Sequence, residues 1–189
     1  MIAQESITHE LLEGADEAIA QFQALIAPLD NDDINRIPYP DSWTAAQLFS
    51  HMTKSMDLMA NALGTSGKPV ERDPGMRIPE LKEIFLGFSP ELKSPDTLVP
   101  ETGVFEKRAV MEDLSSSFER LKTNASAANL TDGVDDLPLG PLTKLEIQHF
   151  VVYHTQRTLR QLTKSTSTMA TSRPPGRGYR WPERRRGAG

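Results

Sequence analysis

Residues 142–162 form a long stretch without glycine or proline and read LTKLEIQHFVVYHTQRTLRQL. Gly140 and Pro141 bound this stretch upstream. Its apolar side chains recur at three- and four-residue steps, which predicts an amphipathic helix. The predicted buried face contains Leu142, Leu145, Ile147, Phe150, Val151, Val152 and Leu159. His154 lies in the middle of this helix, on the side that it shares with Phe150 and Thr158. The residues that His154 contacts on the other helices therefore decide what function this segment can have.

Three further segments carry the same helical spacing. They span residues 6–29, 44–63 and 105–128, and no stretch shows the alternation that is typical of a strand. Four long helical patterns without strand signals predict one all-α domain, a four-helix bundle. Asp41 or Ser42 is positioned to cap the second of these helices.

Residues 64–105 connect the second and third predicted helices and differ from them in composition, because Gly and Pro recur throughout. These residues forbid a long helix, although 79–85 can form a short one with Pro79 at its first position. A connection of this length is unusual in a helical bundle. We therefore expect a long Pro/Gly-rich crossover that covers one end of the bundle.

The formal net charge of −5 hides an uneven distribution. Residues 173–189 contain six Arg and one Glu, a local net charge of +5, which leaves the rest of the chain at −10. This end has no periodic apolar face, so we expect a bundle over residues 1–165 and a disordered Arg/Pro/Gly-rich tail over 166–189. Arg interleaved with Tyr179 and Trp181 could stack on single-stranded nucleic acid, but an acidic body repels nucleic acid. An unconstrained terminal extension is the simpler interpretation.

The composition excludes several classes of protein. The chain has no Cys, so it forms no disulfide and offers no thiolate ligand or cysteine nucleophile. No segment approaches the ~18 uninterrupted apolar residues of a membrane span. The acidic, amphipathic N-terminal segment lacks the basic and apolar regions of a signal peptide. We therefore expect a cytoplasmic protein with no membrane contact.

Histidines lie on the predicted apolar faces of two helices. His51 follows Leu48 by three residues and precedes Leu58 by seven, so it points into the core or to its rim, and His154 lies on the last helix. A lone histidine in such a place is more often a hydrogen-bonded core residue than a metal ligand. Both interpretations stay open from the residues alone.

Two motifs together carry a family resemblance. SWTAAQLFSHM at residues 42–52, followed about a hundred residues later by YHTQRTLRQL at 153–162, resembles the DinB/YfiT-like superfamily. The signature of this superfamily is a Trp that opens the second helix, a His several residues later, and H-x-x-x-H followed by a Gln on the last helix. The resemblance covers about residues 1–165 and not the Arg-rich tail.

The resemblance implies a four-helix bundle that holds a divalent metal, such as zinc or nickel, through three histidines. His51 matches the ligand on the second helix, and His154 matches the first His of an H-x-x-x-H pair on the last helix. The position of the second His is occupied by Thr158. A neutral hydroxyl is a poor ligand for zinc or nickel. We therefore expect a two-histidine site with weak or absent metal binding.

Other side chains are candidates for the missing ligand. His149 lies five residues before His154, about 140° around the helix, so we exclude it as a ligand of the same metal. Gln161, Asp57 and Glu146 stay open, because nothing in the sequence singles one out.

Three functions follow from this interpretation. The resemblance implies a metal-dependent thiol S-transferase or hydrolase, in which a low-molecular-weight thiol supplies the sulfur that the chain lacks. The second is a non-catalytic bundle with a degenerate metal site that binds a small molecule or a partner protein, and the third is nucleic-acid binding through the tail. No spacing of Ser, Lys and carboxylate residues indicates a nucleophile with its base, so no catalytic residue is assigned. The resemblance also implies a homodimer.

Overall fold

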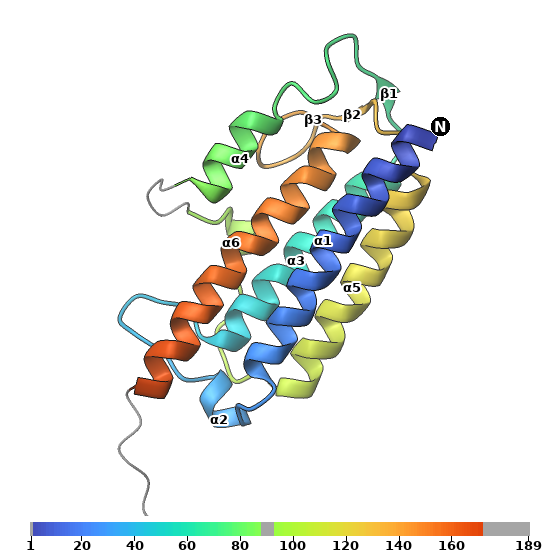
Figure 1. Ribbon diagram of the computed structural model, residues 1–189. Coiled ribbons are helices and arrows are strands. Elements are labelled where there is room, and N and C mark those ends of the chain that lie inside the picture. Colours follow the sequence, from blue (N-terminus) through green and yellow to red (C-terminus); the bar gives the residue numbers. More distant parts are fainter. Residues whose placement is uncertain (1, 88–92, 172–189) are drawn as a thin grey trace, which may run out of the picture.

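The computed structural model of the chain describes residues 2–87 and 93–171. Four long helices lie side by side along a common axis (Figure 1), so the predicted all-α four-helix bundle is confirmed. The four helices are α1 (Ile2–Ile26), α3 (Ala45–Gly64), α5 (Lys107–Ala127) and α6 (Lys144–Thr171).

The order of the helices around the bundle explains the long crossover. α1 contacts α5 and α6, and α3 contacts the same two helices, so α1 and α3 lie across a diagonal. α1 and α6 run in one direction and α3 and α5 in the other, as the colours of Figure 1 show. Since α3 and α5 are consecutive, parallel neighbours, the chain must travel back along the ~30 Å of a 20-residue helix between them. No short loop can make this connection.

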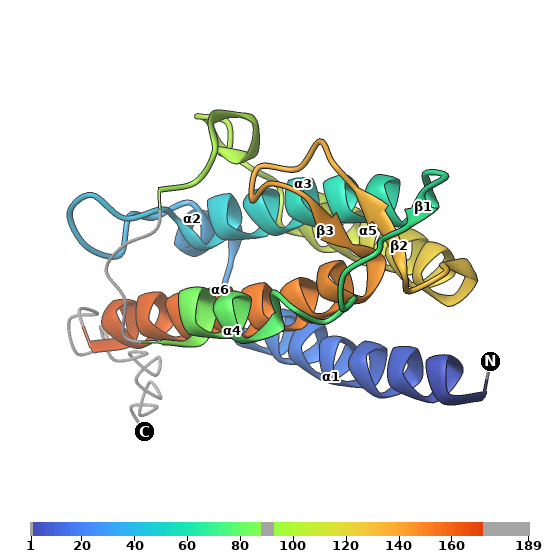
Figure 2. The same cartoon turned by 90° about the horizontal axis from the view of Figure 1, so that it is seen from above.

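We expected the crossover to cover an end of the bundle, but its described part packs mainly along the sides of two helices, and only its first strand, β1 (Lys68–Pro69), lies at one end (Figure 1). The crossover also contains α4 (Ile78–Leu86), which lies beside α6, and the 3₁₀ turn η1 (Asp96–Leu98), which contacts α3 (Figures 1 and 2). α4 confirms the short helix predicted at 79–85, and its two buried side chains are Leu81 and Phe85. The crossover therefore covers the face between α3 and α6.

A small antiparallel sheet at one end of the bundle has no counterpart in the sequence prediction. It consists of β1 (Lys68–Pro69), β2 (Asp132–Val134) and β3 (Leu142–Thr143), in that order. Gly133 pairs with both Lys68 and Thr143. Strands of two or three residues are too short to show alternation, which is why the sequence gives no strand signal. Leu142, predicted to be helical, belongs to β3, and α6 begins two residues later.

The start of α3 differs from the prediction by a few residues. Thr44, and not Asp41 or Ser42, caps the helix, because its hydroxyl accepts from the Gln47 backbone N–H at 3.1 Å while the Gln47 side chain accepts from the Thr44 N–H at 3.0 Å. This is a capping box. Asp41 has a φ of 58° and forms part of the preceding turn, which a short polar side chain tolerates. α2 (Asn31–Ile34) is a single turn after α1.

The end of α6 lies beyond the predicted boundary of the bundle. Residues 166–171 belong to α6, and Ser165 and Met169 are buried. The rest of the predicted tail, residues 172–189, lies outside the described residues. None of the described helices combines the length and apolar character that a membrane span needs.

The core is formed by apolar side chains from all four long helices. Phe22 of α1 and Phe49 of α3 meet edge to face across the bundle diagonal, with ring centroids 5.3 Å apart. Both side chains are fully buried. Further fully buried side chains are Ile26, Met52, Met56, Leu63, Leu81, Leu114, Phe118, Leu121 and Leu142. Most of these positions follow the helical spacing read from the sequence.

A buried carboxylate ties the crossover to the start of α6. Glu146 has a fully buried side chain, and its two oxygens accept four hydrogen bonds. Arg72 donates two of them, at 2.7 and 2.6 Å, and the backbone N–H groups of Arg77 and Thr143 donate the others at 2.8 and 2.9 Å. The Thr143 hydroxyl in turn accepts from the Glu146 N–H at 3.2 Å, so the pair also forms a capping box for α6.

These contacts set the charge state of Glu146. Burial alone would raise its pKa, but the hydrogen bonds from Arg72, Thr143 and Arg77 outweigh this effect and lower the pKa below its ordinary value. A carboxyl group whose pKa is lower in the folded than in the unfolded state stabilises the fold above its unfolded pKa. This stabilisation is lost as the pH falls through the lower, folded-state pKa.

We expect Glu146→Gln to reduce the free energy of unfolding at pH 7 by about 3 kcal/mol, because it leaves Arg72 without its buried partner. The variant should also lose less stability than wild type below about pH 4.5, where Glu146 of the unfolded chain takes up a proton before Glu146 of the folded chain does. Urea unfolding at several pH values measures both effects. Glu80→Gln is the control, since Glu80 pairs with Arg77 on the surface and should cost less than about 1 kcal/mol. Equal losses in the two variants would contradict the anchoring role of Glu146.

Candidate functional site

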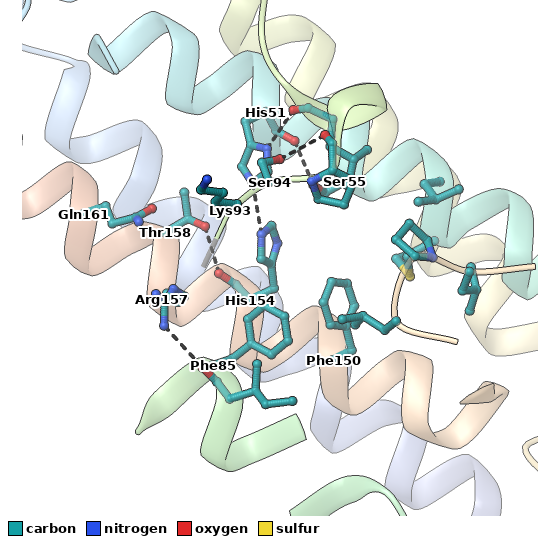
Figure 3. Close-up of a pocket in the computed structure, with 18 of the residues that line it drawn as sticks. His51, Ser55, Phe85, Lys93, Ser94, Phe150, His154, Arg157, Thr158 and Gln161 are labelled. Atoms are coloured by element: carbon teal, nitrogen blue, oxygen red, sulfur yellow. Dashed lines mark hydrogen bonds between the residues drawn. The ribbon is translucent and has the colours of Figure 1, made fainter. Parts of the chain in front are cut away.

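A pocket of about 220 Å³ lies between α3, α6, the crossover and the loop that joins β2 to β3 (Figure 3). The helices contribute His51 and His154, and the loop contributes Leu137, Pro138 and Leu139. Most of the remaining lining side chains are apolar. They include Trp43, Leu58, Met59, Ile84, Phe85, Pro95, Leu98, Leu142 and Phe150.

The two histidines predicted as a pair meet inside this pocket. Nε2 of His51 lies 3.1 Å from Nε2 of His154. Nδ1 of His51 lies 2.9 Å from the carbonyl oxygen of Leu98, which can only accept a hydrogen bond. We therefore assign the proton of His51 to Nδ1, which leaves its Nε2 as an acceptor for the N–H of His154. Helical spacing places His51 and His154 in the core, and the Leu98 carbonyl of the crossover fixes the tautomer of His51.

Both imidazoles are neutral at physiological pH. Burial lowers the pKa of His154 to about 3, and the nearby His51 and Arg157 contribute to the same shift. Burial also lowers the pKa of His51, although the hydrogen bond to Leu98 partly opposes it. A base with so low a pKa takes up protons poorly near pH 7. His154 can therefore act as a neutral hydrogen-bonding group or as a ligand.

Aromatic rings surround the histidine pair. Phe150, one turn before His154 on α6, stacks on it with centroids 5.2 Å apart, and Phe85 of α4 meets it edge to face at 5.7 Å. The Trp43 ring lies 5.0 Å from the ring of His51. These contacts restrict both imidazoles to one orientation and remove them from water.

Thr158 lines the pocket at the position where the resemblance implies a third histidine. Its hydroxyl donates to the carbonyl oxygen of His154 at 3.0 Å, one turn earlier on α6. The 3.1 Å separation of the two Nε2 atoms suits two ligands bound to one metal at ~2.0–2.1 Å. However, no group of three or more His, Cys, Asp or Glu in the described residues is placed to hold a metal. The residues present do not fit a three-histidine site.

Two of the candidate replacement ligands are engaged elsewhere. Glu146 is fully bonded to Arg72 and its neighbours, and Asp57 forms an ion pair with Arg120 on the surface. Gln161 does line the pocket. His149 lies outside the lining and faces Tyr153, with ring centroids 5.8 Å apart, in agreement with its exclusion on helical geometry.

The sequence did not point to several of the residues that shape the site. Lys93, Ser94 and the Leu98 carbonyl come from the irregular part of the crossover, and Leu137–Leu139 come from the loop before β3. Such residues follow no periodic pattern, so their positions in the fold could not be predicted from the sequence. Phe85 was the exception, because it lies within the short helix that the sequence predicted.

We expect acid to weaken the fold through His154. The unfolded chain binds a proton near pH 6.5 and the folded chain only near pH 3, so His154 should cost about 2 kcal/mol of stability between pH 7 and pH 5. In chelator-treated protein, His154→Gln should be less sensitive to pH by this amount in urea unfolding. His9→Gln, at an exposed position on α1, should behave as wild type. An NMR titration of the His154 ring with a midpoint above pH 5 would contradict the assignment.

Comparisons with known proteins give the family and the fold. The model of the DinB superfamily matches residues 15–162. A conserved protein from Enterococcus faecalis has the same fold, with 19% identity and a TM-score of 0.61 over 87% of this chain and 98% of that one. YfiT from Bacillus subtilis, described as a probable metal-dependent hydrolase with an unusual four-helix bundle topology, matches at 12% identity with a TM-score of 0.55, over 86% of this chain and 87% of that one. No curated protein matches the sequence. The match to the family model spans most of the bundle and includes both His51 and His154, so the chain belongs to the DinB superfamily.

Proposed function

We propose that this DinB-like protein is a non-catalytic binding protein that holds a small, largely apolar organic molecule in the pocket beside His51 and His154. The observation that carries the proposal is the direct hydrogen bond between the two neutral imidazoles in an apolar-lined cavity. Enclosed apolar pockets with a few fixed polar groups are the usual form of small-molecule sites. The apolar lining supplies affinity, and the polar atoms orient the ligand.

The hydroxyl groups of the pocket support binding over catalysis. Ser55 donates to the His51 carbonyl oxygen at 2.9 Å, Thr158 donates to the His154 carbonyl oxygen, and Ser94 donates to the Pro95 carbonyl oxygen at 3.4 Å. None of these three hydroxyls donates to a general base in the way that an activated nucleophile requires. His154, with its low pKa, is also a weak base. Among the described lining residues, no pair is therefore arranged to start a nucleophilic reaction unaided.

A second candidate function is that of a diverged metal-dependent hydrolase or thiol S-transferase. The 3.1 Å separation of the Nε2 atoms of His51 and His154 favours it, as does the description of YfiT. A divalent metal such as zinc or nickel would lower the pKa of a water molecule or a low-molecular-weight thiol. His51 and His154 would be its two protein ligands, and Gln161 is the remaining candidate for a third.

We expect Thr158→Phe to block the pocket and reduce binding of the apolar fluorescent probe N-phenyl-1-naphthylamine at least about tenfold, because the larger ring occupies ligand space. A fluorescence titration measures the affinity, and circular dichroism checks the fold. Thr163→Phe is the matched control. Thr163 makes the same kind of hydrogen bond, to the Leu159 carbonyl at 2.8 Å, but is exposed and outside the pocket. If folded wild type shows no saturable binding, or both variants bind equally, the proposal is wrong.

Thr158→His should tighten binding of zinc or nickel by about two orders of magnitude, since it adds a third imidazole on the same face of α6. Competition with a chromogenic chelator measures the affinities of wild type and variant. His51→Ala and His154→Ala should remove the gain. Near-stoichiometric metal in wild type, lost in both alanine variants, would favour the metal-dependent candidate over the binding protein.

A further inference from the structure

The charged side chains among the described residues that line the pocket are both basic. Arg157 and Lys93 line it, and no Asp or Glu does so among the described residues. The positive charge of the lining contrasts with the formal net charge of the whole chain, which is −5. Lys93 is exposed and Arg157 is half-buried, so both charges contact solvent in the free protein and are accessible to an anionic group at the pocket.

Arg157 is held at the pocket by a backbone contact to α4. It lies three residues after His154 on α6, and its Nη1 donates to the carbonyl oxygen of Ile84 at 3.3 Å. It forms no ion pair with any carboxylate of the described residues. A guanidinium has five N–H donors in a planar fork. Arg157 therefore keeps donors for a ligand.

Lys93 and two uncharged polar residues gather near Arg157. In Figure 3, Lys93, Thr158 and Gln161 lie on the same side of His154 as Arg157, and Phe150 lies on the other side. Lys93 also forms no ion pair within the described part of the chain. The pocket thus has a polar, cationic side next to its apolar part.

We infer that the ligand is an organic anion, with its apolar body against Phe85, Phe150 and the Leu137–Leu139 loop and its carboxylate or sulfonate group beside Arg157 and Lys93. This inference rests on the proposed binding function and adds the chemical class of the ligand. Charge-assisted hydrogen bonds from Arg to such groups are stronger than neutral ones.

The pocket continues into a neighbouring groove, which leaves space for a ligand longer than the cavity. Trp43, Lys93, Ser94 and Gln161 line both spaces. The groove adds Tyr39, Ser42, Leu48, Val99 and Ser165, together with one carboxylate, Asp41. The cation Lys93 therefore lies at the junction of the two, and an anionic group bound there can carry apolar parts in either direction.

The test must distinguish the loss of a ligand contact of Arg157 from the loss of its structural contact with α4. Another arginine on α6 serves as the matched control. Arg160 lies three residues further on, and its Nη1 donates to the Leu86 carbonyl oxygen at 3.4 Å. Both arginines thus bond to a backbone carbonyl at the end of α4. Arg160, however, does not line the pocket. If Arg157 only anchors α4, the two substitutions should have the same effect.

The test compares two probes that differ by one anionic group. These are 8-anilinonaphthalene-1-sulfonate and N-phenyl-1-naphthylamine, which lacks the sulfonate. Only binding that Thr158→Phe removes is counted as pocket binding. We expect Arg157→Gln and Lys93→Gln each to weaken the sulfonate probe about tenfold, and to change the neutral probe less than twofold. Arg160→Gln should change neither, and Arg157→Lys should retain part of the affinity for the sulfonate probe.

The two proposals fail in different ways. If Arg157→Gln and Lys93→Gln weaken both probes equally, or weaken neither, the anion inference is overturned while pocket binding stands. Absence of pocket binding by either probe to wild type overturns the proposed function and, with it, this inference. Lys93→Gln keeps the test decisive if Arg157→Gln fails to fold, because Lys93 makes no ion pair in the described structure that its loss would break.

Discussion

The carboxylate of Glu146 is the interaction on which the arrangement of the crossover depends. Its two oxygens accept from Arg72 and from the Arg77 backbone, 74 and 69 residues earlier in the crossover, and from the backbone of Thr143, three residues earlier. A buried carboxylate is stable only when its hydrogen-bonding capacity is filled, so this group selects one position of the crossover relative to α6. α4 begins directly after Arg77 and inherits that position.

The pocket is a consequence of the path that the crossover takes along the bundle. Parallel α3 and α5 require a connection that runs back along the bundle, and this connection lies over the face between α3 and α6. It places Phe85 against His154 and the Leu98 carbonyl against His51. The helices alone would bring the two imidazoles together, but they would not fix a tautomer or enclose a cavity. The site is therefore built from the bundle and from its crossover.

The sequence could predict the parts of this structure that follow a period. Helical spacing gave the four long helices, placed His51 and His154 on inward faces, and excluded His149 as their partner. It could not place Lys93, the Leu98 carbonyl or the Leu137–Leu139 loop, because irregular segments have no period and a backbone carbonyl has no residue-specific signal. Thr44 shows a different limit. The T-x-x-Q capping box was readable, yet Asp41 and Ser42 nearby were equally good caps on propensity alone.

Thr158 connects the histidine pair to the charge of the pocket. The Thr158 hydroxyl bonds to its own helix, no third imidazole of the described residues joins His51 and His154, and the two imidazoles bond to each other. A divalent cation held by neutral ligands beside Arg157 and Lys93 would meet like charges with no carboxylate in the described lining to offset them. An anion at the same place would meet opposite charges. The positive charge of the described lining is thus the property on which the proposed anionic ligand depends.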